Sequence, residues 1–395
     1  MKKLISTLLM LVLSSVLYAD PDPSVTMQTA ALGYPYTQPF TVMATFSEPV
    51  TGFGPSEINV VNAIVTKVSK IAGSQANYIL TVIPKLPGAM TIFIPASVVR
   101  SLSSGGPNLV SNKLNITALD PTLNPSSNFD LSLWTLTLPV PLGDIGNATT
   151  ISNATLVGQP SLNTGYTNPP YFYTDSVAGS MNFFAPLNGA TTPGSVFPRC
   201  ELSEQLPTSP GTWLLSTYDS NTLSASLLVT QVPPSKKIVI GSIQDKGTTD
   251  ASGQLVAVKS LVKIYYDLNP LDPNGNACNG CIYARIRPVP AQEVYLKTVT
   301  LLNNTPLNKL FMYRITLLDT GALTVKVNNK SQTYDLNTST DNTVGWGTQQ
   351  LLFKAGVYIL DNGSSDSQGG AANFYSLQIK HTGCPATPTV NGSSQ

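Results

Sequence analysis

The run Phe353-Lys354-Ala355-Gly356-Val357-Tyr358 decides the fold of this chain, because Phe, Ala and Val alternate in it with Lys, Gly and Tyr. In a β-strand, a period of two sends successive side chains to opposite faces. Lys354, Gly356 and Tyr358 therefore share one face, and the three apolar side chains share the other. The predicted strand presents a cation, a gap and a phenol on one surface, with a core-facing surface behind them.

A second run, Arg199-Cys200-Glu201-Leu202-Ser203-Glu204, alternates in the same way. Arg199, Glu201 and Ser203 share one face of this strand, while Cys200 looks the opposite way into a core. Together the two runs predict a cationic surface that carries a proton-transfer group. Such a surface suits an anionic substrate that loses or gains a proton.

Most other periodic segments after residue 127 are also strand-like, and helical periodicity of useful length is absent. The segments are 223–229, 237–243, 261–266, 282–286, 311–317 and 323–327. This pattern predicts an all-β domain that forms a β-sandwich or jelly roll.

Residues 23 to about 118 are predicted to form a separate, smaller all-β module. Its strand-like runs at 40–46, 78–82 and 90–94 are separated by Gly, Pro, Ser and Asn turns at sandwich spacing. The phrase Phe46-Ser47-Glu48-Pro49-Val50-Thr51-Gly52-Phe53 resembles a run of bacterial immunoglobulin-like domains. The resemblance implies an immunoglobulin-like β-sandwich, which would be a spacer or would bind a glycan or surface.

The segments outside these two domains have compositions of their own. Residues 119–127 carry two prolines and several turn formers, which predicts a linker before a second domain at 128–384. Residues 385–395 form a polar tail that we expect to be mobile. Residues 1–19 combine Lys2 and Lys3 with an apolar run and Ala19, the pattern of a secretory signal peptide. We therefore expect the mature chain to be secreted or periplasmic.

The charge of the mature chain is close to neutral. Removing Lys2 and Lys3 from the 22 basic residues leaves 20, against 21 acidic ones. A polyanion must then be held by a local cluster of cations, and nucleic acid is a poor candidate partner. No later stretch approaches the roughly 20 apolar residues of a transmembrane helix. We expect a monomer that needs neither a metal nor another cofactor.

The four cysteines, Cys200, Cys278, Cys281 and Cys384, all fall in the second domain. In an exported protein they can oxidise, and three pairings are possible. Cys278-Asn279-Gly280-Cys281 is a turn sequence that a local disulfide could close, which leaves the other two cysteines paired or free. A zinc site or a redox pair is disfavoured, because no second C-x-x-C or His cluster accompanies this one.

The two opening runs also carry a family resemblance. They are similar to the R-T/S-E-L-R and Y-F-K-A-G-x-Y strands of the alginate-lyase-type polysaccharide lyases, family seven and its relatives. Further matches in the family's order are Trp134-Thr135-Leu136-Thr137-Leu138-Pro139, residues 182–192 and Phe374-Tyr375-Ser376-Leu377. The resemblance spans about residues 127–384. It implies a jelly roll that cleaves an anionic uronic-acid polymer, such as alginate, poly-D-mannuronate or glucuronan, by β-elimination.

One motif of the family is changed in this chain. Ile240-Gly241-Ser242-Ile243-Gln244 stands where the family has I-G-Q-I-H, so Ser242 replaces a Gln and Gln244 replaces a His. The run that begins at Arg199 also lacks the second Arg of its motif. The chain's only histidine, His381, lies far downstream in a terminal strand pattern, where we expect a structural role.

β-Elimination needs a group that neutralises the C6 carboxylate, a base at C5 and an acid at the departing O4. The resemblance implies that Arg199 is the neutraliser and Tyr358 the acid, while Ser242 and Gln244 remain as neutral hydrogen-bonders to the carboxylate. Gln244 cannot replace the missing base, because an amide does not titrate near neutrality. The catalytic candidates are therefore Tyr358, Arg199 and Gln244.

The loss of the His restricts the stereochemistry of the predicted reaction. In D-mannuronate and D-glucuronate, the C5 proton and O4 lie on the same side, so one residue can accept the first and protonate the second. In L-guluronate they lie on opposite sides, and two groups are needed. The sequence therefore favours syn elimination on a D-configured uronate, with Tyr358 as base and then acid. A tyrosine titrates near 10, so this role requires adjacent cations such as Arg199.

The candidates for substrate binding are Glu201, Ser242, Lys354 and Arg285. Lys354 lies four residues before Tyr358, about 13 Å along a strand at roughly 3.3 Å per residue, so we expect it to hold a neighbouring sugar's carboxylate. Glu201 would orient one of the cations by ion pairing. The alternative is a plain salt-bridge network on the sheet, or for Arg285 a solvated strand face.

Two other classes of function remain open. A non-catalytic carbohydrate-binding protein on the same scaffold is supported by the replacements at positions 242 and 244. A jelly-roll hydrolase needs two carboxylates across a cleft. Glu201 and Glu204 point to opposite faces of one strand, which disfavours them as that pair.

Overall fold

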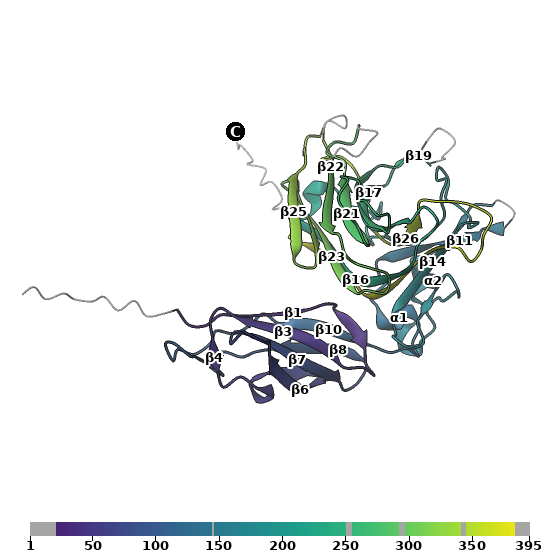
Figure 1. The fold of residues 1–395 in the computed structure, drawn as a ribbon. Helices are drawn as coiled ribbons and strands as arrows, with labels where there is room; N and C mark the ends of the chain where they lie inside the picture. The colour runs from purple at the N-terminus through teal and green to yellow at the C-terminus, as the bar shows by residue number, and fades with distance from the viewer. Residues whose placement is uncertain (1–20, 144–145, 250–254, 292–296, 341–344, 384–395) are drawn as a thin grey trace, which may run out of the picture.

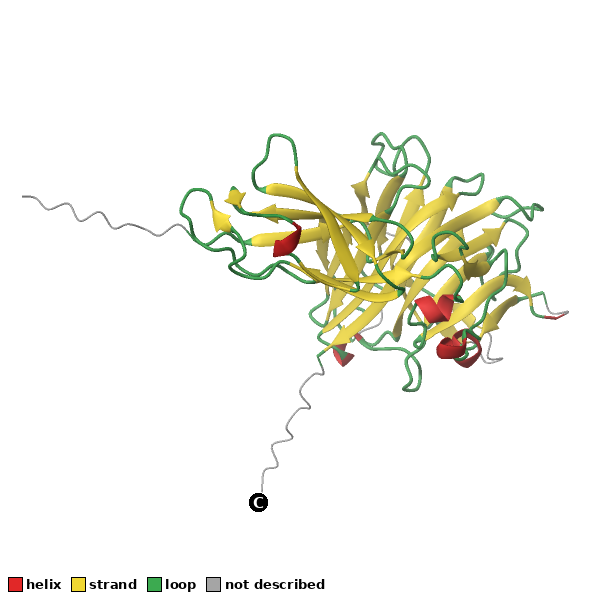
Figure 2. Ribbon diagram, turned by 90° about the horizontal axis from the view of Figure 1, so that it is seen from below, coloured by secondary structure: helices red, strands yellow, loops and turns green. Residues whose placement is uncertain are grey.

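The structure is a computed structural model that describes residues 21–143, 146–249, 255–291, 297–340 and 345–383. Strands dominate it, and the helices are a few short turns at its periphery (Figure 2). The predicted signal peptide at 1–19, the tail at 385–395 and Cys384 lie outside the described residues. The all-β prediction is confirmed.

The N-terminal module is a sandwich of two four-stranded sheets, in the orders β1-β3-β7-β6 and β2-β10-β8-β5. Its core comes from strand alternation: the buried residues of β3 are Phe40, Val42, Ala44 and Phe46. The classification of this sandwich as immunoglobulin-like stays a prediction. Its strands are β1 (Val25–Thr29), β2 (Gly33–Pro35), β3 (Phe40–Phe46), β4 (Val50–Thr51), β5 (Asn59–Val61), β6 (Ala63–Lys70), β7 (Asn77–Pro84), β8 (Gly88–Phe93), β9 (Arg100–Ser101) and β10 (Leu114–Leu119), with a 3₁₀ turn at Pro55–Glu57.

The second domain is a jelly-roll sandwich of two larger sheets (Figure 1). The eight-stranded sheet contains, in order, β12 (Ala148–Ile151), β11 (Trp134–Pro141), β15 (Arg199–Glu204), β26 (Leu351–Ile359), β17 (Lys237–Asp245), β20 (Ser260–Asp267), β21 (Cys281–Ile286) and β22 (Lys297–Leu302). The seven-stranded sheet contains, in order, β13 (Phe172–Thr174), β14 (Met181–Pro186), β27 (Gly369–Thr382), β16 (Ser220–Gln231), β23 (Phe311–Leu318), β24 (Ala322–Val327) and β25 (Lys330–Asp335). The smaller elements are α1 (Pro125–Asn128), α2 (Asn153–Val157), 3₁₀ turns at Pro160–Leu162 and Leu215–Thr217, and the hairpin of β18 (Thr248–Thr249) and β19 (Leu255–Ala257).

The core of this domain fills the space between the two sheets. Its largest fully buried side chains include Trp134, Trp213 and Trp346. The predicted alternation holds in β15, where Cys200 and Leu202 are fully buried in this core. The inner face of β15 in the eight-stranded sheet therefore packs in the core, and the polar side chains of Arg199 and Glu201 point to the opposite face.

A buried polar bridge joins the two sheets. His381 of β27 places Nε2 2.6 Å from Oε1 of Glu204 on β15, and its Nδ1 lies 2.6 Å from Oδ1 of Asn221 on β16. The other carboxylate oxygen of Glu204 accepts hydrogen bonds from Trp213 Nε1 at 2.8 Å and from the backbone N–H of Phe353 at 2.9 Å. These contacts support the structural role predicted for His381, and they place Glu204 on the face opposite to Glu201.

Replacing Glu204 in this bridge should have a large effect on the stability of the fold. Glu204→Ala should lower the free energy of unfolding by about 3–5 kcal/mol, because three buried donors lose their acceptor. Glu204→Gln keeps an acceptor oxygen at the same place and should cost less. Denaturant unfolding followed by tryptophan fluorescence measures both variants, and an unchanged midpoint in Glu204→Ala would contradict the bridge.

The junction between the two domains is packed. Leu119, the last residue of β10, is fully buried and belongs to the core of the second domain. The segment predicted as a linker, 119–127, therefore begins inside that core. A Cβ on Gly33 of the module would lie 1.6 Å from the backbone oxygen of Tyr375 on β27, so the close approach requires glycine. The module thus rests against the seven-stranded sheet.

Candidate active site

A cavity of about 320 Å³ opens on the polar face of the eight-stranded sheet. Strands β15, β26, β17 and β20 contribute to its lining, and the loop 192–197 closes one side. Six of the seven residues predicted from the sequence line it: Arg199, Glu201, Ser242, Gln244, Lys354 and Tyr358. The seventh, Arg285, lines a neighbouring cavity.

Strand register brings these side chains together. Antiparallel pairing of β15 with β26 sets Arg199 opposite Tyr358 and Glu201 opposite Gly356. On its other side, β26 pairs with β17, where Ser242 lies opposite Lys354. Directly paired residues have neighbouring side chains on the same face, so the two sequence runs meet as their alternation predicts.

Gly356 is required by the backbone at this point. Its φ is +138°, a conformation that residues with a side chain rarely adopt. A Cβ added there would lie 2.6 Å from the carbonyl oxygen of Cys200. The gap predicted between Lys354 and Tyr358 is therefore also a position of close strand approach.

Glu201 holds both cations of the site. Its Oε2 lies 3.1 Å from Arg199 Nη1 and 3.3 Å from Lys354 Nζ. Burial alone would raise the pKa of the Glu201 carboxyl, but the charges of Lys354 and Arg199 and their hydrogen bonds outweigh it and hold that pKa below its usual range. Burial lowers the pKa of the Lys354 ammonium, although Glu201 opposes this shift. Two cations share one buried carboxylate, which leaves an excess of positive charge.

The side chain of Lys354 extends towards Arg199, although its spacing from Tyr358 along the strand predicted a contact with a neighbouring sugar. Its backbone lies four residues from Tyr358, yet its ammonium contacts the same carboxylate that binds Arg199. The side chain of Lys354 is 11% exposed. Its nearest partner is thus Glu201, and its contact with a neighbouring sugar stays a prediction.

Tyr358 lies beside Arg199 and beside two groups that the sequence analysis did not name, Lys263 and Ser195. The guanidinium of Arg199 lies 4.2 Å from the centre of its ring, and the ammonium of Lys263 lies 5.4 Å from it. The Tyr358 hydroxyl is 3.4 Å from Ser195 Oγ, which also accepts a hydrogen bond from Arg199 Nη2 at 3.1 Å. Lys263 is the cross-strand partner of Ser242. Its alternation in the run 261–266 could have revealed it, whereas nothing in the sequence marks Ser195.

A bulge in β17 sets the positions of Ser242 and Gln244. The register shifts between Val239 and Gly241, so that Ile240 and Ile243 are both buried in the core. Ser242 is three positions after Val239, a spacing that puts side chains on opposite faces of a regular strand, yet both line the cavity with Gln244. Ser242 is buried and Gln244 is half-buried, so both can reach a ligand only as neutral hydrogen-bonding groups.

The neighbouring cavity, of about 460 Å³, continues along the same face. Phe197 lines both cavities. The second cavity presents Arg285 beside the rings of Tyr265 and Tyr283, which stack at 5.0 Å with 9° between their planes. An Arg beside a stacked aromatic pair could hold a further sugar, and this role of Arg285 stays a prediction.

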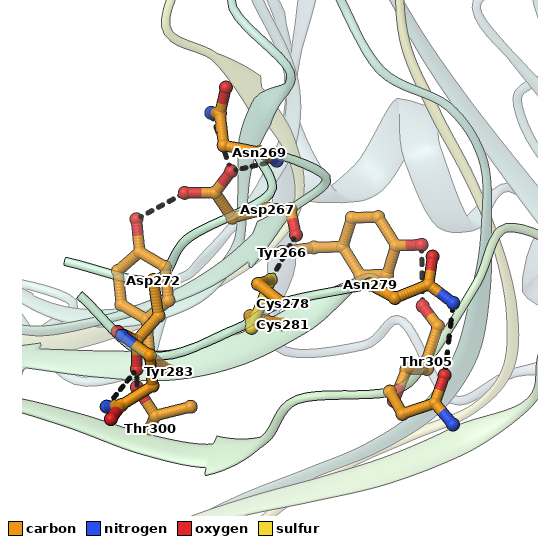
Figure 3. Close-up of a disulfide and its surroundings, with 12 residues drawn as sticks. Tyr266, Asp267, Asn269, Asp272, Cys278, Asn279, Cys281, Tyr283, Thr300 and Thr305 are labelled. Carbon is orange, nitrogen blue, oxygen red and sulfur yellow. Dashed lines mark hydrogen bonds between the residues drawn. A yellow bond between two sulfur atoms is a disulfide. The ribbon is translucent and has the colours of Figure 1, made fainter. Parts of the chain in front are cut away.

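A disulfide supports the loop at the edge of this second cavity (Figure 3). Cys278 and Cys281 are bonded, which is one of the pairings that the sequence left open. Asp267, at the start of the same loop, accepts a hydrogen bond from the Tyr283 hydroxyl at 3.2 Å. Cys200 is free and buried, and burial raises the pKa of its thiol well above the usual range.

Two kinds of feature are absent from the described residues. These residues contain no helix that is long and apolar enough to cross a membrane. In the same residues, no group of three or more His, Cys, Asp or Glu side chains could hold a metal ion.

Comparison with known proteins agrees with this geometry. The sequence pattern of the family described as "Alginate lyase" matches residues 129–381. An alginate lyase from Klebsiella pneumoniae is 27% identical over 293 residues, which cover 65% of this chain and 91% of that protein.

Among solved structures, the second domain resembles an alginate lyase from Pseudomonas aeruginosa with 32% identity and a TM-score of 0.52, over 64% of this chain and 100% of that one. It also resembles alginate lyase A1-II', a member of polysaccharide lyase family 7, with 30% identity and a TM-score of 0.51, over 66% of this chain and 99% of that one. The family match covers more than half of the chain and contains the whole cavity. This chain therefore belongs to the alginate lyase family and is a polysaccharide lyase.

Proposed function

We propose that this lyase cleaves alginate, or a related polymer of D-configured uronic acid, by β-elimination, with Arg199 as the neutraliser and Tyr358 as the proton carrier. The observation that carries the proposal is the charge around Tyr358. Arg199 and Lys354 share one carboxylate, and Lys263 adds a further cation at the ring. A cavity with this excess of positive charge favours an anionic sugar next to a phenol.

In the proposed reaction, a sugar carboxylate lies against Arg199, whose side chain is 11% exposed and so remains accessible from the cavity. Removal of the C5 proton moves negative charge onto that carboxylate, and the nearby cations stabilise it. The electron pair left at C5 forms the C4–C5 double bond as the C4–O4 bond breaks. The departing O4 then takes up a proton, which gives one unsaturated chain end and one new hydroxyl.

Tyr358 is the proposed carrier of both protons. Tyr358 lines the cavity, and Arg199 and Lys263 place their positive charges against its ring. Gln244 stands where the family's motif has a His, and an amide cannot replace that His as a second proton carrier. A single carrier suits syn elimination.

The test of the function is the absorbance of the new unsaturated ends during incubation with uronate polymers. Neither binding nor hydrolysis creates a C4–C5 double bond, so the assay separates a lyase from both alternatives. Absence of this signal with alginate, poly-D-mannuronate and glucuronan would overturn the proposal.

The stereochemical argument gives a second prediction. Initial rates on purified homopolymers should be higher for poly-D-mannuronate or glucuronan than for polyguluronate, because Tyr358 is the single proton carrier in the proposed reaction. Gln244→His should raise the relative rate on polyguluronate by supplying a second carrier, although Ser242 leaves the carboxylate contacts altered. Faster cleavage of polyguluronate by the natural chain would show that another group performs the second proton transfer.

Export of the chain is part of the proposal. The signal-peptide pattern at 1–19 motivates it, and the disulfide between Cys278 and Cys281 is of a kind that forms in oxidising compartments. A polymeric substrate outside the cell would require such a location.

A further inference from the structure

A second cleft lies between the N-terminal module and the seven-stranded sheet, away from the active site. Its volume is about 540 Å³. Figure 1 shows β1 of the module facing β16 and β23 of the second domain. Contacts such as the hydrogen bond from the Leu32 backbone N–H to Ser226 Oγ at 3.3 Å hold the two walls together. The side chains used below are Thr26, Gln28 and Met43 on the module wall and Met312, Arg314 and Lys326 on the sheet wall.

The sheet wall of this cleft carries two cations that lie side by side on neighbouring strands. Arg314 on β23 is the direct cross-strand partner of Lys326 on β24, and both are exposed. Like charges in this position repel each other. Within the described ranges, neither side chain forms an ion pair with a carboxylate. The Nε of Arg314 donates to Ser224 Oγ at 3.0 Å, which fixes the guanidinium on the wall.

The rest of the cleft suits a sugar. Thr26 and Gln28 are exposed and offer hydroxyl and amide groups from β1. Met43 and Met312 are half-buried and offer apolar surface for the C–H faces of a pyranose ring. An anion bound between the two cations would relieve their repulsion.

We propose that this interdomain cleft is a second binding site for an acidic oligosaccharide, with Arg314 and Lys326 holding its carboxylates. The class of sugar rests on the proposed function, since the substrate polymer is the uronate that this lyase meets at high local concentration. Binding at a second site on the same chain raises the effective concentration of polymer at the active site. The module is then a wall of a binding site as well as a spacer.

The test uses the full chain with Tyr358→Phe, so that the ligand is not consumed. Calorimetric titration with a D-mannuronate tetrasaccharide should give two binding events per chain. Adding Arg314→Ala and Lys326→Ala should weaken one of them roughly 30-fold, because the loss of two charged contacts of about 1 kcal/mol each removes about 2 kcal/mol. That event should also weaken with added salt.

A matched control removes the same charge elsewhere. Lys67→Ala with Lys70→Ala alters β6, at the edge of the module's first sheet opposite to β1, where both lysines are exposed. This pair should leave both binding events unchanged. With Tyr358 intact, the cleft variant should raise KM on long polymer and leave kcat/KM on the tetrasaccharide unchanged.

The outcomes separate the two proposals. One binding event in the Tyr358→Phe chain, or two events that the cleft variant leaves unchanged, would overturn the second site. If the Tyr358→Phe chain shows two binding events but the natural chain releases no unsaturated ends, the second site stands and only the proposed function is overturned.

Discussion

Tyr358→Phe is expected to abolish elimination while it leaves polymer binding nearly intact. The change removes a hydroxyl and keeps the ring over which Arg199 and Lys263 lie. Proton transfer by a positioned side chain typically contributes roughly 10²–10⁴-fold to a rate. Because Tyr358 is proposed to carry both protons, we expect a loss in kcat near the upper end of that range, with KM nearly constant. Initial rates from the absorbance of unsaturated ends measure it.

Tyr265→Phe is the matched control for this variant. It makes the same chemical change on the same face of the sheet, in the neighbouring cavity. Its effect on kcat should be small, because Tyr265 lies two strands away from β26 in the sheet order. Cleavage by Tyr358→Phe at a rate near that of the natural chain would remove Tyr358 from the mechanism.

Alternation of residue types was enough to place the main site residues on one face. It assigned Arg199 and Glu201 to one face and Cys200 to the other, and the structure places the first two in the cavity lining and Cys200 in the core. Period two is a local property of a strand, so it can be read without knowing which strands are neighbours.

Contacts that depend on neighbouring strands could not be read in this way. Lys263 reaches Tyr358 from β20, and that pairing order is set by the whole sheet. The spacing of Lys354 along its strand gave only the distance between backbones, and its expected ion pair with Glu201 depends on the register of β15 with β26. The bulge in β17 similarly depends on how Ile240 and Ile243 pack in the core.

The sequence pattern also did not predict that the junction between the two domains is packed. Two prolines and turn formers predict a linker by composition. The burial of Leu119 and the approach of Gly33 to Tyr375 arise only when both domains are folded. The interdomain cleft, with its neighbouring Arg314 and Lys326, follows from that docking.

Arg199→Ala should harm both binding and turnover, with the larger effect on turnover. The contact of Arg199 with the sugar carboxylate strengthens as enolate charge develops, and loss of one such donor can cost roughly 100-fold or more in kcat. Arg285→Ala removes the same charge from the neighbouring cavity and should act mainly on KM. Separate measurement of kcat and KM distinguishes the two arginines.

Arg199→Ala also has an expected effect on acid stability, which serves as a check on its contact with Glu201. The pKa of Glu201 is held below its usual value by Lys354 and Arg199. A carboxyl with a lowered pKa in the folded state stabilises the protein above its unfolded pKa of about 4.5, and this contribution is lost as pH falls through the folded value. Without Arg199 the folded pKa rises towards the unfolded value, so the carboxyl contributes less stability and the loss of that contribution on acidification is smaller and complete at higher pH. An unchanged kcat together with this shift would show that Arg199 positions Glu201 and that another cation neutralises the substrate carboxylate. Lys263, whose ammonium lies 5.4 Å from the centre of the Tyr358 ring, is a candidate.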